Sequence, residues 1–168
     1  MFKLIVKGLG GQGAKTAIEI LAVAANYEDK YFLAYPEFGP ERTGTPISAF
    51  FKMDDSLIRD RSPIKMADCI LVLSERIERI DSELKKGGVL ILNSKKKHEK
   101  YFSVDADKIS LENGSNKNNM FMLGILINKT KILKKESLVK AIKEKTKPEF
   151  LNLNLKCFEA GYKYEESN

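Results

Sequence analysis

The sequence predicts a single α/β domain that spans residues 1–168. Three observations lead to this prediction. Apolar runs of strand length alternate with stretches of helical periodicity, the first apolar run ends in a cluster of glycines, and neither a linker nor an internal repeat divides the chain. A chain of 168 residues with 43% hydrophobic side chains can also bury one sizeable core.

The first strand is expected at residues 2–6, and the sequence Gly8-Leu9-Gly10-Gly11-Gln12-Gly13 follows it. Closely spaced glycines let a strand turn sharply and bring bare backbone N–H groups up to an anion. Residues 14–26, rich in Ala, Ile and Leu, supply a helix whose N-terminal dipole also favours negative charge. The loop is therefore a candidate phosphate-binding site, although a tight turn that packs helix on strand without a ligand would use the same glycines.

The same glycines are also compatible with a dinucleotide-binding unit. Gly8, Gly10 and Gly13 have the spacing of that fingerprint, and Glu37 lies near the position of a ribose-binding carboxylate. Such a unit needs another helix after its second strand, which we expect at residues 31–35. Residues 36–46 instead contain three prolines and two glycines, which forbid a regular helix. We therefore predict a long rigid loop that leads straight into a strand at 47–53.

The rest of the chain continues the α/β pattern. Buried strands are predicted at residues 67–74 and 89–93, with a further short strand at 101–104. A short helix is predicted at 77–86, where Gly87-Gly88 would stop it. Asn119 and Ser137 are predicted to cap two helices. After Pro148, apolar residues at helical spacing predict a last helix that packs on the sheet: Phe150, Leu151, Leu155, Phe158 and Tyr162.

Composition predicts a soluble, cytoplasmic protein. The opening residues 1–7 are too short and too charged for a signal peptide, and no apolar run approaches the roughly 18 residues that a membrane span needs. Cys69 and Cys157 are isolated in apolar settings, so we expect reduced, buried thiols rather than a disulfide, a zinc site or an iron–sulfur site within this chain.

The net charge of +6 comes almost wholly from lysine. The lysines alternate with glutamates on predicted helices and lack interleaved aromatic or arginine readers, so a solvated face is favoured over nucleic-acid binding. The alternative is that the lysines form a positively charged surface that attracts an acidic protein or the phosphates of a ligand.

Self-contained catalytic machinery is absent from the sequence. The one histidine, His98, lies within a lysine run, so no plausible nucleophile–histidine–acid set can form, and metal-ligand spacing is missing as well. The chain is therefore expected to supply binding groups and to leave the reacting centre to a cofactor or to another chain.

Two loops together identify a family resemblance. The glycine loop is followed about 23 residues later by a proline-rich loop with the pattern Gly-Pro-Glu-Arg-x-Gly-x-Pro at residues 39–46, and this combination resembles the gamma subunit of the 2-oxoacid:ferredoxin oxidoreductases. The resemblance continues through residues 58–64, 67–73, 87–93, 104–106 and 119–124, and so covers nearly the whole chain. The chain departs from the usual pattern at Thr43, where many members carry a second arginine or another polar residue.

The resemblance implies a three-layer α/β/α domain with a mostly parallel or mixed central sheet, working inside a multisubunit enzyme. Such enzymes decarboxylate pyruvate or a related 2-oxoacid, transfer the acyl group to coenzyme A and reduce ferredoxin. Alpha, beta and delta-type subunits would carry thiamine diphosphate, Mg²⁺ and iron–sulfur clusters, and no catalytic residue is expected in this chain alone. Pyruvate is the expected substrate; 2-oxoisovalerate, 2-oxoglutarate and indolepyruvate stay open, as does a free-standing nicotinamide- or flavin-binding protein.

Family analogy places the glycine loop near coenzyme A, and a nest of bare N–H groups suits a phosphate or a pantetheine carbonyl. The residues assigned to this contact are Gly8, Gly10, Gly11, Gln12, Gly13 and, more weakly, Lys15. The second loop is assigned to an active-site or subunit interface through Phe38, Gly39, Pro40, Glu41, Arg42 and Gly44. Glu41 and Arg42 either face a neighbouring subunit's active site or form an ion pair that shapes the loop.

Overall fold

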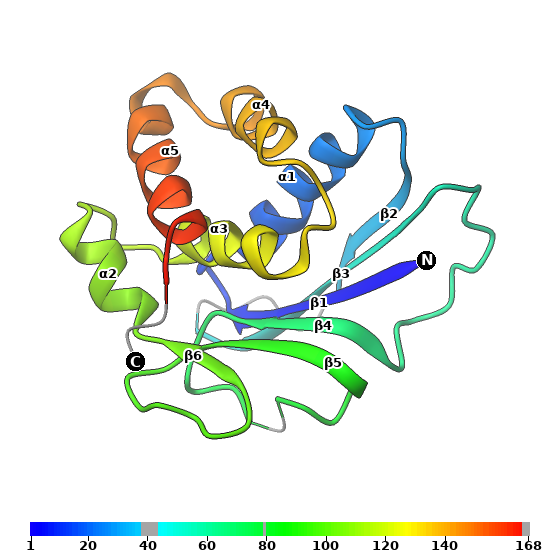
Figure 1. The fold of residues 1–168 in the computed structure, drawn as a ribbon, viewed down its shortest axis with the longest axis horizontal. Helices are drawn as coiled ribbons and strands as arrows, with labels where there is room; N and C mark the ends of the chain where they lie inside the picture. Colours follow the sequence, from blue (N-terminus) through cyan, green and yellow to red (C-terminus); the bar gives the residue numbers. More distant parts are fainter. Residues whose placement is uncertain (38–43, 79, 166–168) are drawn as a thin grey trace.

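A computed structural model describes residues 1–37, 44–78 and 80–165. Its centre is a six-stranded mixed sheet with the order β2-β3-β1-β4-β5-β6 (Figure 1). The strands are β1 (Phe2–Leu9), β2 (Tyr31–Pro36), β3 (Pro46–Asp54), β4 (Ala67–Val72), β5 (Leu84–Asn93) and β6 (Phe102–Val104). The helices are α1 (Ala14–Asn26), α2 (Ala106–Glu112), α3 (Asn119–Thr130), α4 (Lys135–Lys145) and α5 (Pro148–Tyr162). The predicted α/β class and mixed central sheet are confirmed.

The pairing of β2 with β3 excludes the βαβ unit of a dinucleotide-binding fold. β3 is antiparallel to both β2 and β1, whereas a βαβ crossover joins parallel strands. β1, β4, β5 and β6 are mutually parallel neighbours. The parallel part of the sheet therefore begins at β1, directly before the glycine loop.

Helices α1, α3, α4 and α5 lie on one face of the sheet, and α2 lies at one end (Figure 1). Leu4 and Val6 of β1 face this helical side and belong to the main core with Phe121 and Phe158. α3 is buried along almost its whole length, because it lies between the sheet and α5. The predicted last helix is confirmed and begins at Pro148, which suits the first helical position because it lacks an N–H.

Connecting segments, rather than helices, cover the opposite face in the described residues. Ile5, Phe50 and Ile70 form a second apolar cluster there with Ile64 and Ile77 from the connections. Two buried lysines also face this side: Lys7 pairs with Glu83, and Lys52 binds the 60–62 segment. The third layer implied by the resemblance is thus formed by loops.

Three expectations about local structure are wrong. None of the described residues among 77–86 is helical, and β5 already begins at Leu84. Residues 85–88 form an irregularity opposite Asp68, in which Gly87 has φ +79°. The paired glycines therefore belong to a strand irregularity rather than to a helix end. Ser137 does not cap α4 either, since α4 begins at Lys135, and Asn119 is the first residue of α3, after the N-cap Asn118.

Helix α2 was not expected from the sequence. Asp105 caps it by accepting a hydrogen bond from the Lys108 N–H at 3.0 Å. The helix has only seven residues and two buried side chains, so its apolar periodicity is too weak to predict a helix there.

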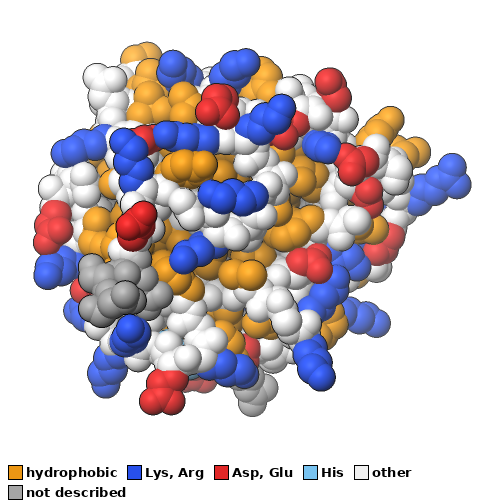
Figure 2. Space-filling view, viewed as in Figure 1, with side chains coloured by type: hydrophobic (Ala, Val, Ile, Leu, Met, Phe, Trp, Pro, Cys, Tyr) orange, Lys and Arg blue, Asp and Glu red, His pale blue; other side chains and the backbone are white. Residues whose placement is uncertain are grey.

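The described helices include none that is long and apolar enough to cross a membrane. Both cysteines are buried and free, and burial raises the pKa of the Cys69 thiol to about 12. Basic side chains are spread among acidic and apolar ones over the visible face (Figure 2), which fits the solvated-face interpretation of the lysines.

Candidate functional site

The glycine loop leaves the end of β1 and rests against the start of β3. The Gly10 N–H donates to the Thr45 carbonyl at 2.8 Å, and the Gly44 N–H donates to the Gly10 carbonyl at 3.3 Å. Gln12 closes the turn from both sides: its N–H donates to the Leu9 carbonyl at 3.0 Å, and its Oε1 accepts from the Leu9 N–H at 2.7 Å. The Gln12 side chain therefore shapes the loop itself.

Several backbone donors of the loop are free. Gly11 and Gly13 both have φ +90°, a left-handed conformation that turns successive N–H groups outward. Within the described part of the chain, no atom accepts from the N–H groups of Gly11, Gly13 or the first three residues of α1. The first turn of α1 also contains no acidic residue. This arrangement presents a cluster of donors at the positive end of a 13-residue helix.

Gly13 also brings the start of α1 against the start of α3. A Cβ atom at position 13 would lie 2.3 Å from Asn119 Nδ2, well inside van der Waals contact. A side chain at residue 13 would therefore force the Asn119 side chain to shift.

A buried polar network fixes the neighbouring segment beyond β4 and β5. The Leu73 carbonyl accepts from Asn93 Nδ2 at 3.0 Å and from Asn118 Nδ2 at 2.9 Å. The Asp107 carboxylate accepts from the same two amides, at 3.0 Å and 2.6 Å. Asn118 Oδ1 is buried and has no hydrogen-bond partner among the described residues. The network holds Asn118 next to the glycine loop and leaves one acceptor unsatisfied.

Two cavities adjoin the loop. A small one of about 140 Å³ is lined by Gly11, Gln12, Asp107, Asn116, Lys117 and Asn118. A larger one of about 510 Å³ extends from Gly13 and Thr16 past Met120 to Phe150, with Lys117, Lys145 and Lys147 on its wall. These lysines make no ion pair within the described residues. The combination of free N–H groups, cations and apolar side chains suits an elongated anionic ligand with apolar parts.

The position in the sheet also suits a ligand site. After β1 the chain passes through α1 toward β2 on one side, whereas after β4 it passes to β5 on the other side. Neighbouring parallel strands whose connections diverge leave a crevice at their carboxyl ends, and ligands of open α/β sheets bind there. The glycine loop and Leu73 lie at those ends.

The predicted binding residues are brought together only in part. Gly11, Gln12 and Gly13 line the cavities, whereas the Lys15 side chain is 66% exposed, lies 3.9 Å from Glu19 and lines neither cavity. Sequence reasoning missed the cavity-lining residues Asn116, Lys117, Asn118 and Asp107. The polar run at residues 115–119 before an apolar helix was the available signal for most of them.

Most of the predicted interface loop, namely Phe38, Gly39, Pro40, Glu41 and Arg42, lies outside the described residues. Gly44 is described and has φ +88°. Within the described residues, no atom lies within 4 Å of the position that its Cβ would take.

Comparison with known proteins gives one consistent result. Residues 3–164 match the family model described as pyruvate ferredoxin/flavodoxin oxidoreductase. Subunit PorC of pyruvate synthase from Methanothermobacter marburgensis is 41% identical over 152 residues, 86% of each chain. The common subunit gamma of the pyruvate/ketoisovalerate oxidoreductases from Thermococcus litoralis is 39% identical, over 98% of this chain and all of that protein.

Among solved structures, the pyruvate oxidoreductase subunit PORC of Thermotoga maritima has a TM-score of 0.83 and 32% identity, over 96% of this chain and 94% of that one.

Proposed function

The chain belongs to the pyruvate ferredoxin/flavodoxin oxidoreductase family as a gamma-type subunit, and we propose that its part in the reaction is to hold coenzyme A at the glycine loop. The complete enzyme would decarboxylate pyruvate oxidatively, transfer the acetyl group to coenzyme A and pass electrons to ferredoxin. Coenzyme A carries phosphates at one end and a thiol at the end of an apolar, amide-containing arm. The protein must therefore anchor the phosphates and leave the thiol free to reach a reacting centre elsewhere.

The cluster of free N–H groups at Gly11, Gly13 and the start of α1 carries this proposal. Backbone donors at a helix N-terminus bind phosphate without any further cation. Lys117, Lys145 and Lys147 add positive charge along the larger cavity, and Met120 and Phe150 add apolar surface. Asn118 Oδ1 is an unsatisfied acceptor beside the loop that an amide or hydroxyl of a bound ligand can satisfy. These groups fit coenzyme A better than they fit a small inorganic anion.

The other cofactors belong, in this proposal, to the alpha, beta and delta-type partner subunits. The described residues contain no group of three or more His, Cys, Asp or Glu side chains that could hold a metal ion. Thiamine diphosphate with Mg²⁺ would supply decarboxylation, and iron–sulfur clusters would carry the electrons. This chain's residues bind and orient coenzyme A but exchange no proton with the oxoacid.

The second loop completes the proposal as a docking element. Phe38, Gly39, Pro40, Glu41, Arg42 and Gly44 would meet the neighbouring subunit that holds the thiamine cofactor. The Arg42 guanidinium can pair with a carboxylate or phosphate there through two parallel hydrogen bonds. Prolines at both ends of the loop reduce the conformational entropy lost on docking.

The test is anaerobic purification of the tagged full chain from its native cells, with identification of the co-eluting proteins. The eluate is assayed for coenzyme A-dependent reduction of ferredoxin or viologen by pyruvate. Stoichiometric recovery of thiamine- and cluster-bearing subunits together with activity is the expected result. A chain that elutes alone, is inactive with every 2-oxoacid and binds a nicotinamide or flavin would contradict the proposal.

One observation favours a second substrate. The Thermococcus litoralis relative is named as a subunit common to pyruvate and ketoisovalerate oxidoreductases. A shared gamma subunit is compatible with a ligand site for coenzyme A, because this co-substrate is the same for both oxoacids. The same assay with 2-oxoisovalerate, 2-oxoglutarate and indolepyruvate in place of pyruvate separates the possibilities.

A further inference from the structure

The 58–64 segment crosses the loop-covered face of the sheet and is tied down by a fully buried lysine. Lys52 of β3 has an exposed fraction of 0%. Its ammonium donates to the Ser62 carbonyl at 2.7 Å, to the Asp60 carbonyl at 3.0 Å and to Asp60 Oδ2 at 3.2 Å. Lysine is almost never fully buried unless its charge is paired, and all three donors of this one are used on a single loop.

Further contacts fix the same segment. The Asp60 carboxylate accepts from the Ser62 N–H at 2.9 Å and from the Ser62 hydroxyl. Ile58 and Ile64 are buried on either side, and the Tyr35 hydroxyl donates to the Ser62 carbonyl at 3.4 Å. The 58–64 segment is therefore held at both ends and in the middle. Three exposed, charged side chains lie within it: Arg59, Asp60 and Arg61.

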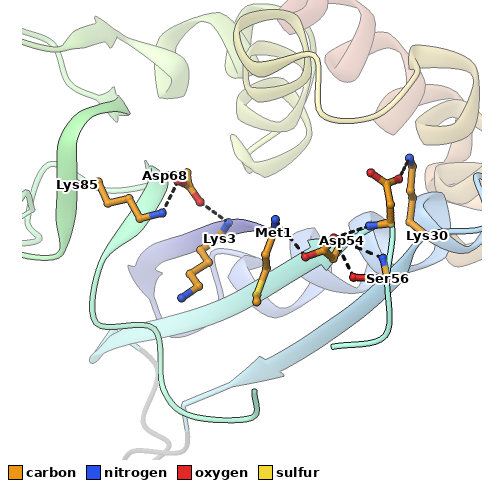
Figure 3. A network of polar contacts seen from close by, with 8 residues as sticks. Met1, Lys3, Lys30, Asp54, Ser56, Asp68 and Lys85 are labelled. Carbon is orange, nitrogen blue, oxygen red and sulfur yellow. Dashed lines mark hydrogen bonds and ion pairs between the residues drawn. The ribbon is translucent and has the colours of Figure 1, made fainter. Parts of the chain in front are cut away.

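The acidic side chains on and near this segment form ion pairs, whereas its two arginines form none among the described residues. Asp54 pairs with the Met1 amino group at 3.1 Å, Asp55 pairs with Lys30, and Asp60 pairs with Lys52. Figure 3 shows Met1 and Lys30 on either side of Asp54. Arg59 and Arg61 are exposed and make no ion pair or hydrogen bond within the described residues. The carboxylates are thus occupied, and the two guanidinium groups are free.

We propose that Arg59 and Arg61 form a docking surface for an acidic face of a partner subunit; this inference rests on the proposed role as a subunit. Each guanidinium offers a planar set of donors that matches a carboxylate. A loop that is already rigid loses little entropy on binding, which strengthens association. Neither arginine lines a described cavity. A protein surface therefore fits them better than a small anion does.

The location supports an interface on this side. Tyr35, which contacts Ser62, directly precedes Pro36, where the predicted interface loop begins. The Tyr35 ring also packs on Phe50, with ring centroids 5.3 Å apart. The arginine pair therefore lies beside the end of β2, on the β2–β3 side of the molecule.

The first experiment compares three forms of the tagged full chain in complexes purified anaerobically: wild type, Arg59→Glu/Arg61→Glu, and Lys95→Glu/Lys96→Glu as a charge-matched control away from the loop. Identified partner subunits are dissociated with increasing salt. We expect the arginine variant to bind its partners at least tenfold more weakly, whereas the control behaves as wild type. Both variants should keep the wild-type unfolding temperature, because the substituted side chains are exposed.

A second experiment tests the chemistry of the partner surface. An Arg59→Lys/Arg61→Lys chain in the assembled complex is treated with a carbodiimide, which joins an amine directly to a carboxylate. A cross-link from position 59 or 61 to an Asp or Glu of a partner subunit is the expected result.

A Lys52→Met chain, which retains both arginines but loses the loop anchor, should bind partners more weakly and be cleaved faster by trypsin after Arg59 and Arg61.

Three outcomes are decisive. Unchanged salt resistance of the Arg59→Glu/Arg61→Glu complex, with its partners still bound, overturns the docking surface and leaves the subunit role intact. Cross-links to no partner carboxylate also overturn it. A wild-type chain that elutes without partners overturns both the subunit role and this inference.

Discussion

At position 13, backbone conformation and a close neighbour both require glycine. The φ of +90° is unfavourable for any residue with a Cβ, and Asn119 occupies the space that this Cβ would need. Gly44 has nearly the same φ, +88°, but no atom of the described chain lies within 4 Å of the position of its Cβ. The two glycines therefore separate the effect of backbone strain from the effect of contact.

Gly13→Ala is expected to destabilise the protein more than Gly44→Ala does. The backbone alone should cost about 1–2 kcal/mol at either position, and the contact with Asn119 adds to this only at position 13. Urea unfolding of both variants measures the difference. Equal losses at the two positions would show that the Asn119 side chain moves aside freely.

Asp60 predicts a pH dependence of stability. Hydrogen bonds from the Ser62 hydroxyl and N–H, together with the Lys52 ammonium, hold the pKa of this carboxyl well below its usual range. A group whose pKa is lowered by folding contributes stability above its unfolded pKa of about 3.9, and that contribution is lost as the pH falls toward the folded value.

Asp60→Asn should therefore be less stable than wild type at pH 7, and the difference should shrink as the pH falls from about 5 to 2. Urea unfolding at several pH values measures it. Glu112→Gln removes an exposed carboxylate of α2 that makes no ion pair in the described residues, and it is the control. A difference from wild type that does not vary with pH would exclude this role of Asp60.

At the scale of elements, the crossing of α3 and α5 depends on two glycines. A Cβ at Gly124 would lie 2.2 Å from the Phe158 carbonyl oxygen, and one at Gly161 would lie 1.9 Å from the Phe121 carbonyl oxygen. The atoms in the way belong to the backbone, so the helices would have to separate. Asn128 Nδ2 adds a hydrogen bond to the Tyr162 carbonyl at 2.6 Å across the same contact.

Gly124→Ala and Gly161→Ala are each expected to lower the free energy of unfolding by about 1–3 kcal/mol, as overpacking does in other cores. This loss outweighs the gain of up to about 1 kcal/mol in helix propensity from replacing glycine by alanine. Thermal or urea unfolding measures the result. Asn152→Ala on the exposed side of α5 should cause no loss, and a stabilising effect at position 124 or 161 would contradict the close crossing.

At the scale of the whole molecule, the two faces of the sheet are covered by different kinds of structure. Helices cover one face through a continuous apolar core, whereas connecting segments cover the other and are anchored by the buried lysines Lys7 and Lys52. At the carboxyl edge, the starts of α1 and α3 and the connection from α4 to α5 together border the larger cavity. The proposed ligand site is thus a property of the assembled fold.

Lys117→Gln/Lys147→Gln is expected to weaken coenzyme A binding by the full chain roughly tenfold, because two unpaired cations on the cavity wall are lost. A tenfold loss of affinity corresponds to about 1.4 kcal/mol of binding free energy. Isothermal titration calorimetry at low and high salt measures this, and the loss should be smaller at high salt. Lys95→Gln/Lys96→Gln, with the same change of charge away from this cavity, should bind as wild type does. Equal affinity of both variants would remove these lysines from the site.

Several features of this protein were determined by the sequence alone. The glycines predicted the end of β1, the prolines argued against a βαβ unit at β2, and the apolar periodicity after Pro148 predicted the last helix. Each of these signals acts through local backbone geometry. The family resemblance rests on the same local motifs. Only tertiary structure decided that Lys85 and the paired glycines join a strand, since the pairs on either side of them, Ala67 with Leu84 and Cys69 with Val89, are nonlocal.

Tertiary structure also decided which side chains surround the glycine loop. Asn118 and Asp107 reach it through a network that includes Leu73, 45 residues from Asn118 in the chain. Lys15, adjacent in sequence, points away from the cavities because its place on α1 directs it to Glu19 and solvent. Spacing along the chain fixes backbone turns, whereas the set of neighbours around a ligand depends on how distant segments pack.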